Sequence, residues 1–252
     1  MGLLDGDTAL VTGAASGIGR GIARAIAAEG AKLVVSDLPG EAGEALARET
    51  GATFVAADLS DRAGASELFQ AARAVLGSVS ILVHSACPKR REDQTVLAVS
   101  EAQWDEMMDV ALRSGFVLGQ AAAAHMIERG IRGRMLFITS LHAYTPRNLP
   151  HYSASKAGQT MLVRELARAL GQYAIRVNAI APGAVLGGGF QGDEAALTAA
   201  IPMGRTGCPE DVAGMALALL SDRFSRYVTG TTVDVDGGLA LYNWIPFASP
   251  TV

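Results

Sequence analysis

The stretch TALVTGAASGIGRGIARAIAAEGA, residues 8–31, joins a short apolar run, three closely spaced glycines and a helix-forming segment. The run at 8–13 is apolar on consecutive positions, which is typical of a strand buried on both faces. Gly13, Gly17 and Gly19 follow, and 17–29 has the apolar spacing of a helix. Glycines between a first strand and a first helix let backbone N–H groups approach a pyrophosphate. The stretch therefore predicts a dinucleotide-binding turn.

The same alternation of apolar run and helix-forming segment continues along the chain. Strands are predicted at 8–13, 32–37, 52–58, 80–85, 134–140, 175–183 and 231–238, and helices at 17–29, 40–50, 61–76, 101–129, 153–171 and 209–221. Ser100 with Gln103 has the pattern of a capping box, and Pro209 suits the first position of a helix. No linker or repeat divides the sequence. We therefore expect one doubly wound α/β domain over 1–252, a Rossmann-like parallel sheet with helices on both faces.

One long irregular stretch interrupts this regularity. Residues 181–205 follow a predicted strand end and are rich in glycine. Long loops in compact domains are usually functional lids or disordered segments. We expect a mobile substrate lid at about 184–205, with a featureless excursion as the alternative. The apolar end NWIPFASPTV is expected to cover the rim of the active site or a neighbouring subunit through residues 244–252.

Composition excludes several classes of protein. The chain is 50% hydrophobic and 18% charged with a net charge of −4, and no basic stripe indicates a nucleic-acid partner. The basic cluster 89–91 is followed by two acids and is predicted to be a solvated loop. Cys87 and Cys208 form neither a disulfide framework nor a CxxC metal pair. Without a secretory leader or a long apolar run, the sequence predicts a soluble, cytoplasmic protein with no metal and no membrane partner.

A carboxylate follows the second predicted strand, 24 residues after Gly13, at Asp37. Such a carboxylate can accept hydrogen bonds from the adenosine ribose hydroxyls and would repel a 2′-phosphate. Neither Ser16 nor Leu38 is basic, so nothing attracts that phosphate, and NAD is favoured over NADP. Asp37 could instead cap the helix beginning near 40. Asp58, before Leu59, is placed to meet the adenine, with helix capping through 58–61 as the alternative.

Tyr152 and Lys156 form the candidate catalytic pair. Residues four apart on a helix lie on one face, and an ammonium near a phenol favours its ionised form. Tyr152 can then exchange a proton with an alcohol or carbonyl oxygen. Ser140 ends a predicted parallel strand, where doubly wound sheets place their ligands, and can hydrogen-bond the same oxygen. The alternative is an ordinary amphipathic helix start with a packed tyrosine and an exposed lysine.

Several motifs occur together in one order: TGAASGIG (12–19), Asp37, Asp58, Ser140, YSASK (152–156), APG (181–183) and VDGG (235–238). Together they resemble the short-chain dehydrogenase/reductase family across essentially the whole chain. The resemblance implies a seven-stranded Rossmann sheet, an NAD(P)-dependent oxidoreductase and a homotetramer. It implies that Ser140 orients the substrate, Tyr152 is the acid/base, and Lys156 assists the tyrosine and holds the nicotinamide ribose. The implied cofactor-binding residues are Gly13, Ser16, Gly17, Ile18, Gly19, Asp37, Asp58, Leu59, Ser85, Ala86, Tyr152, Lys156, Pro182 and Gly183.

The sequence departs from the family's pattern at two places. The family usually has Asn-Asn-Ala-Gly after its fourth strand, whereas residues 84–87 read His-Ser-Ala-Cys. The family also typically has an asparagine where this sequence has Ala111, and that asparagine helps to hold a water that relays protons through the lysine. Alanine cannot make those bonds, and Asp109 and Arg113 are expected to project from other faces of the helix. Water or another side chain must close the relay, or turnover suffers.

We expect a small-molecule substrate. His142 and His151 flank the candidate catalytic segment, and a neutral imidazole can hydrogen-bond a polyol or sugar; packed or solvated histidines are the alternative. With Ser140 and Tyr152, His142 is the candidate substrate-binding residue. Residues 201–213 and the C-terminal segment look similar to bacterial glucose and other sugar 1-dehydrogenases. The leading hypothesis is an NAD-dependent dehydrogenase of a secondary alcohol. Its rivals are a nucleotide-binding protein with little catalysis and an NADP-dependent carbonyl reductase.

Overall fold

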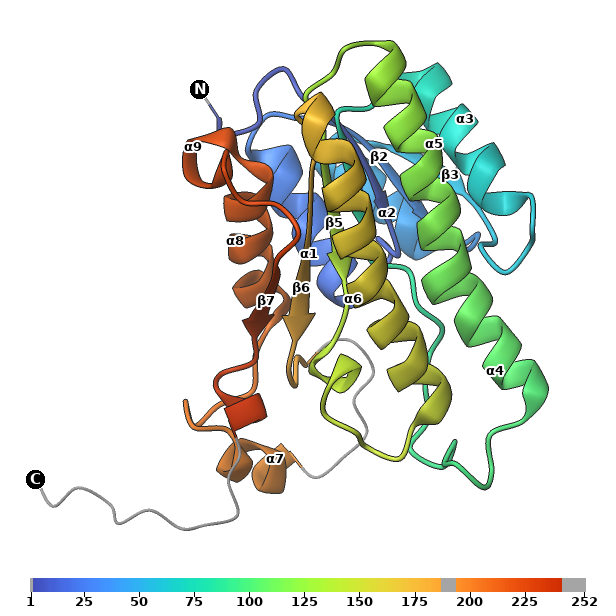
Figure 1. Cartoon of the computed structure of the whole chain (residues 1–252), viewed down its shortest axis with the longest axis vertical. Coiled ribbons are helices and arrows are strands. Elements are labelled where there is room, and N and C mark those ends of the chain that lie inside the picture. Colours follow the sequence, from blue (N-terminus) through green and yellow to red (C-terminus); the bar gives the residue numbers. More distant parts are fainter. Residues whose placement is uncertain (1, 187–193, 242–252) are drawn as a thin grey trace, which may run out of the picture.

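The computed structural model describes residues 2–186 and 194–241. Within these residues, seven strands form one parallel sheet in the order β3-β2-β1-β4-β5-β6-β7 (Figure 1). The strands are β1 (Thr8–Thr12), β2 (Lys32–Asp37), β3 (Thr53–Ala56), β4 (Ile81–His84), β5 (Arg134–Ile138), β6 (Arg176–Pro182) and β7 (Thr232–Val235). The predicted parallel, seven-stranded sheet is confirmed.

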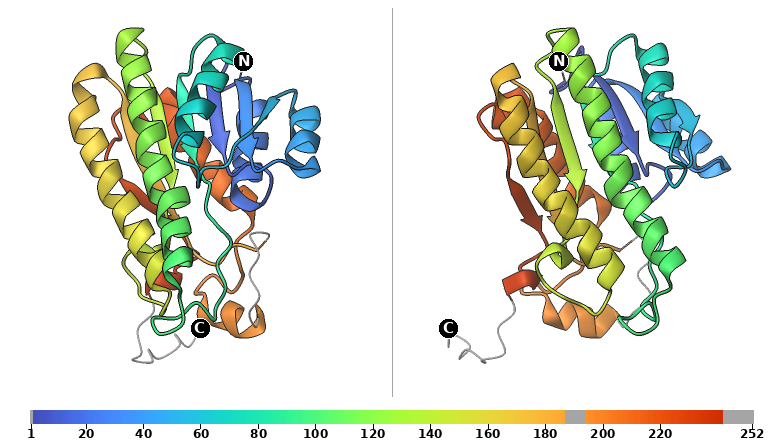
Figure 2. Two further views of the ribbon diagram at one scale, coloured as in Figure 1. Left: turned by 90° about the vertical axis from the view of Figure 1, so that its right-hand side faces the viewer. Right: turned by 45° about the vertical axis from the view of Figure 1, so that its right-hand side comes forward.

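Helices cover both faces of the sheet. The α-helices are α1 (Gly17–Ala28), α2 (Glu41–Thr50), α3 (Gly64–Leu76), α4 (Glu101–Met107), α5 (Ser114–Glu128), α6 (Pro150–Leu170), α7 (Glu194–Ala200), α8 (Pro209–Leu220) and α9 (Asp222–Ser225). A π-helix, η1 (Met108–Arg113), joins α4 to α5, and short 3-10 turns are η2 (Leu141–Ala143), η3 (Gly171–Tyr173) and η4 (Leu239–Leu241). Figure 2 shows α5 and α6 side by side on one face.

Two hydrophobic cores explain why the strands are apolar on consecutive positions. Along β1, Ala9 and Val11 pack with α1, α2 and α8, whereas Leu10 between them packs with α3, α5 and α6. Successive strand residues point to opposite faces, so a sheet covered on both faces favours apolar residues on consecutive positions. Burial of each large aliphatic side chain stabilises the fold by roughly 1.5–3 kcal/mol.

The strand order places a ligand crevice at the carboxyl ends of the strands. β1 has β2 on one side and β4 on the other, so the chain changes direction across the sheet between β1 and β4. The carboxyl ends of β6 and β7 point toward α7 in Figure 1. Doubly wound sheets bind ligands at such a switch point. The glycine turn after β1 and the segment after β4 both lie at this end.

Three predicted segments differ from the structure. The helix predicted over 101–129 is interrupted by η1. The prediction missed this break because the residues of η1 give no periodic signal for a wider turn. The helix predicted from 153 begins at Pro150, whose fixed φ suits a first helical position. The predicted irregular stretch 181–205 contains α7 and a bridge between Val185 and Gly207. Residues 187–193 of the expected lid, and the tail 244–252, lie outside the described residues.

Candidate active site

The glycine turn leaves no room for side chains. Gly13 has φ +66°, and a Cβ there would come within 2.7 Å of the Ala86 nitrogen. A Cβ on Gly19 would lie 2.0 Å from the Gly13 carbonyl oxygen. Ser16 precedes α1 in extended conformation and its hydroxyl makes no cap hydrogen bond. The turn is therefore a bare backbone cradle at a helix N-terminus, and it fits the pyrophosphate of a dinucleotide. Gly17 and Ile18 open α1 beside it.

The altered segment after β4 is tied to β1 by hydrogen bonds. The backbone nitrogens of Ser85 and Ala86 each donate to Thr12 Oγ1 at 3.3 Å. His84 is fully buried, with Nδ1 3.0 Å from the same hydroxyl and Nε2 3.0 Å from the Ala111 carbonyl oxygen. Burial lowers the pKa of His84 to about 4. The ring is therefore neutral, Nε2 donates to the carbonyl, and Nδ1 accepts from Thr12.

The two acidic residues of the cofactor end have different surroundings. Asp37 ends β2, and its carboxylate accepts from the backbone nitrogens of Ala15 and Leu38, both at 2.8 Å. The alternative in which Asp37 caps α2 is wrong, because Gly40 is the N-cap residue and the Asp37 carboxylate bonds Ala15 and Leu38 instead. Asp58 accepts from the Ser60 nitrogen and hydroxyl, which lower its pKa. Asp58 thus closes a local turn before α3, and Leu59 is buried beside it.

Tyr152 and Lys156 lie on the first turns of α6, and Ser140 follows β5. All three are buried, with exposures of 6% for Tyr152, 2% for Lys156 and 4% for Ser140. The Lys156 Nζ lies 5.7 Å from the centroid of the Tyr152 ring and donates to the Ile138 carbonyl oxygen at 2.8 Å. The hydrogen bond to Ile138 joins α6 to the end of β5. The structure therefore brings the three predicted residues to one end of the sheet.

Gln159 completes the polar surroundings of the lysine, and the sequence analysis missed it. It is fully buried one turn after Lys156, accepts from Nζ at 3.1 Å, and donates to the Ala111 carbonyl oxygen at 2.6 Å. A continuous chain of hydrogen bonds therefore runs from Lys156 through Gln159, Ala111 and His84 to Thr12. Its sequence signal was the spacing of three from Lys156, which places both side chains on one helix face.

Asp109 and Arg113, the charged neighbours of Ala111 in η1, do not bond Lys156. Ala111 is buried in η1 and offers its backbone carbonyl. Asp109 and Arg113 form an ion pair at 2.6 Å, and Arg113 also donates to the carbonyl oxygens of residues 60 and 61. These bonds hold Asp109 and Arg113 toward the loop before α3. Both side chains therefore project from other faces of the helix than Ala111, as expected from the sequence.

Apolar and basic groups complete the surroundings of Tyr152. Its ring packs with Met107, Leu149 and Cys87 in a small cluster. His142 meets the ring edge-on at a centroid distance of 6.1 Å. The Arg90 guanidinium lies over the ring at 4.5 Å, a contact that the sequence did not signal.

The last predicted residues lie at the end of β6. Pro182 ends this strand, and a Cβ on Gly183 would lie 2.6 Å from the Asp236 side chain. Tyr144 donates a short hydrogen bond to Asp234, which ties the segment after Ser140 to β7. A cavity of about 600 Å³ opens next to this point, lined by residues that include Ala184, Met203 and Gly237. His151 is buried away from any hydrogen-bond partner among the described residues.

None of the helices in 2–186 and 194–241 is long and apolar enough to cross a bilayer. No group of three or more His, Cys, Asp or Glu side chains in the same ranges is placed to hold a metal ion.

Comparison with known proteins gives matches over nearly the whole chain. Residues 13–240 match a family model described as enoyl-(acyl carrier protein) reductase. The chain is 38% identical to 3beta-hydroxysteroid dehydrogenase 1 of Eggerthella lenta, covering 97% of each. It is 37% identical to 2-dehydro-3-deoxy-D-gluconate 5-dehydrogenase of Escherichia coli, covering 93% of this chain and 96% of that protein. A mutant Serratia marcescens short-chain dehydrogenase/reductase aligns with TM-score 0.85 and 31% identity, over 94% and 99% of the two chains.

Proposed function

Because the chain belongs to the short-chain dehydrogenase/reductase family and is an oxidoreductase acting on CH–OH groups, we propose that it interconverts a secondary alcohol and its carbonyl compound with NAD. The observation that carries the proposal is the pairing of Tyr152 and Lys156 on α6, at the carboxyl end of the sheet where the glycine turn also lies. Both are buried, and Lys156 is anchored to the end of β5. The bare cradle at Gly13 fits the cofactor's pyrophosphate.

The chain's own residues handle the proton and the orientation of the substrate. The phenolic oxygen of Tyr152 takes the proton of the substrate hydroxyl during oxidation and returns it during reduction. Ser140 Oγ accepts from the His142 nitrogen at 3.2 Å, which leaves its own hydrogen to donate to the substrate oxygen. The Lys156 ammonium favours the ionised phenol. When bound, the nicotinamide supplies the hydride chemistry.

The choice of NAD rests on Asp37. Its carboxylate sits against the glycine turn through the Ala15 nitrogen, where the adenosine ribose of a bound dinucleotide is expected. The adjacent Leu38 is exposed and carries no charge. A 2′-phosphate would meet a carboxylate and no cation from either Ser16 or Leu38. NADP is therefore the weaker cofactor in this proposal.

Gln159 takes the place of the family's asparagine in our proposal. Lys156 needs a polar neighbour, and Gln159 Oε1 supplies one at 3.1 Å. The amide of Gln159 is itself fixed by the Ala111 carbonyl, which also accepts from His84. A positioning residue of this kind holds the ammonium beside Tyr152. This arrangement weighs against the rival interpretation as a cofactor-binding protein with little catalysis.

The proposed substrate is a sugar or polyol. The Escherichia coli relative is named for a sugar acid. In this chain, the Nδ1 of His142 donates to the Thr145 carbonyl oxygen at 2.9 Å, because a carbonyl can only accept. Its Nε2 is then an acceptor beside Tyr152, suited to a second hydroxyl group of the substrate.

We also propose a homotetramer in the cytoplasm. Trp104, Phe116 and Met161 are exposed large apolar side chains on α4, α5 and α6. These helices lie next to one another, and an apolar surface of this kind favours association with another subunit. Both cysteines are free thiols, which suits a reducing compartment.

The experiment that tests the proposal is a screen of secondary alcohols, sugars and polyols with NAD and NADP, followed by nicotinamide absorbance. Oxidation with NAD that is lost in Tyr152→Phe supports the assignment. Tight NAD binding without turnover of any compound would favour the rival cofactor-binding role. Preference for NADP would favour the carbonyl reductase instead.

A further inference from the structure

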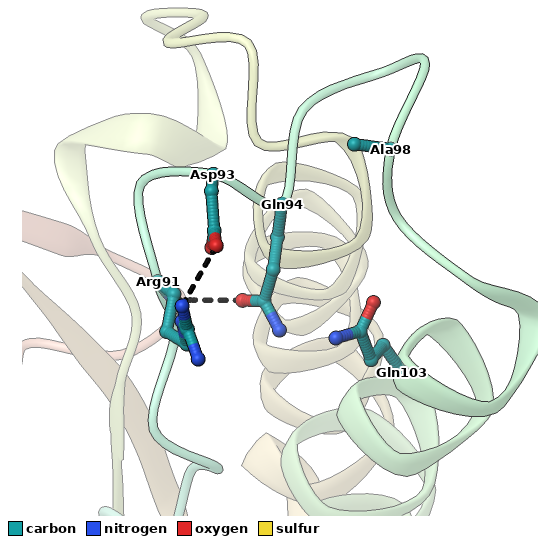
Figure 3. A pocket seen from close by; sticks show the side chains of 5 residues that line it. All are labelled: Arg91, Asp93, Gln94, Ala98 and Gln103. Atoms are coloured by element: carbon teal, nitrogen blue, oxygen red, sulfur yellow. Dashed lines mark hydrogen bonds and ion pairs between the residues drawn. The ribbon is translucent and has the colours of Figure 1, made fainter.

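Arg90 lies against the proposed proton-transfer residue and not in a solvated loop. Its guanidinium is 4.5 Å from the centroid of the Tyr152 ring. The neighbouring Arg91 behaves as the sequence predicted, since it is exposed and pairs with Asp93 at 2.8 Å. Figure 3 shows that pair beside Gln94, in a hollow of about 290 Å³ on the loop. Arg90 and Arg91 therefore have different surroundings despite being adjacent.

The charge of Arg90 is not neutralised within the described residues. Arg90 makes no hydrogen bond or ion pair there, and its Nε is buried without a partner. The nearby acids are already paired, Asp93 with Arg91 and Glu92 with Arg147 at 3.3 Å. Stacking on an aromatic ring is worth only about 0.5–2 kcal/mol. The guanidinium keeps its capacity to bind an anion.

The groups beside Arg90 add a hydrogen-bond acceptor, and the acid that acts on His142, Glu92, is paired with Arg147. Burial lowers the pKa of His142, and the positive charges of Arg90 and Arg147 lower it further. His142 is thus neutral at physiological pH, with Nε2 as an acceptor near Tyr152. Lys156, the other cation against the ring, is held by Ile138 and Gln159. These two bonds leave the Lys156 ammonium one donor, which faces the Tyr152 side in the proposed function, whereas the donors of Arg90 make no bond within the described residues.

We propose that Arg90 binds a carboxylate of the substrate, so that the enzyme acts on a hydroxy acid and its keto acid in preference to neutral alcohols. A planar guanidinium offers parallel N–H donors that match the two oxygens of a carboxylate. Because Arg90 covers the ring whose oxygen exchanges the proton, the carboxylate lies near the reacting carbon. His142 accepts from a further hydroxyl. This inference rests on the proposed function for the reacting group and adds the anionic group.

The test compares hydroxy acids with neutral partners in which a hydroxymethyl group replaces the carboxylate, such as D-gluconate and D-glucitol. Sugar phosphates are assayed as a third class of compound. Wild type, Arg90→Met and the matched control Arg91→Met are assayed for kcat/KM with NAD. Binding of each acid without turnover is measured by calorimetry with NADH present.

We expect wild type and Arg91→Met to prefer the acids. Arg90→Met should lose about 10- to 100-fold on the acids, the effect of one charge-assisted contact, and less than about threefold on the neutral partners. Arg90→Lys should recover part of the acid preference, since it keeps the charge without the planar fork.

Three results would overturn the proposal: equal losses on acids and neutral partners, no acid preference in wild type, or a preference for phosphates over carboxylates. Equal losses would mean that Arg90 only packs on Tyr152. Arg90-dependent acid binding without any turnover would retain the carboxylate site and reject the oxidoreductase role. Tyr152-dependent oxidation of neutral alcohols, unaffected by Arg90→Met, would retain the oxidoreductase role and reject the carboxylate site.

Discussion

Replacement of Gln159 by methionine removes the only side chain that hydrogen-bonds Lys156 among the described residues. Methionine keeps the length of the side chain and lacks both hydrogen bonds. The Lys156 Nζ then retains the Ile138 carbonyl oxygen at 2.8 Å and loses the Gln159 oxygen at 3.1 Å. A hydrogen bond to a charged group contributes about 1.5–3 kcal/mol. If that contact positions the ammonium in the transition state, kcat should fall about 10- to 150-fold.

The assay is steady-state NAD reduction with the best alcohol of the screen, over a range of pH. We expect the rise of kcat with pH to move to higher pH, because a less firmly held ammonium gives less support to the ionised phenol. The Kd of NAD should change by less than about threefold, since Gln159 contacts Lys156 and Ala111 and not the glycine turn. Gln159→Glu, which keeps an acceptor for Lys156, should recover part of the rate.

Thr160→Val is the matched control. Its hydroxyl bonds the backbone carbonyl oxygen of Lys156 at 3.0 Å and not the ammonium. The control should lose stability without a shift in the pH profile. A Gln159→Met enzyme that keeps the wild-type rate and pH profile would refute the positioning role of Gln159.

Three further predictions concern stability, the cofactor turn and assembly. Burial holds the pKa of His84 at about 4, against 6.5 in the unfolded chain, so the stability contributed by the neutral imidazole is present above pH 6.5 and lost as the pH falls toward 4. The free energy of unfolding in urea should be about 2 kcal/mol lower at pH 5 than at pH 8, and His84→Asn should reduce that difference. Gly13→Ala, with φ +66° and a Cβ 2.7 Å from Ala86, should cost about 1–3 kcal/mol and weaken NAD binding in a fluorescence titration, whereas Gly214→Ala, in open space, should do neither. Phe116→Glu with Met161→Glu should lower the mass measured by light scattering, while Phe224→Glu, at another exposed phenylalanine, should not; an unchanged mass in the double variant would exclude this face as the interface.

The sheet could be predicted because its evidence is local. Residues 9–11 and 33–35 are apolar on consecutive positions, and that pattern follows directly from burial on both faces. The break at η1 could not be predicted, since Met108–Arg113 has ordinary helix-forming residues and the wider turn depends on packing. Pro150 carried a usable signal for the start of α6.

In the candidate site too, some residues could be predicted from local sequence spacing, and others are brought together only by the fold. Tyr152 and Lys156 are neighbours on one helix, so their spacing alone predicts that they share a face. His84 and Ala111 come from β4 and η1, and their hydrogen bond exists only because the fold brings those elements together. Arg90 lies in a basic cluster that two acids follow in the sequence, which predicts a solvated loop. Its contact with Tyr152 depends on the path of the loop after β4.

The central claim is that Tyr152 exchanges the substrate proton in an NAD-dependent oxidation. The most direct measurement is NADH formation by wild type and Tyr152→Phe with the same alcohol, with the Kd of NAD determined for both. The account predicts a fall in kcat of at least about 100-fold, within the range of general acid–base catalysis, and little change in Kd. Substantial turnover by Tyr152→Phe at an unchanged Kd would contradict it.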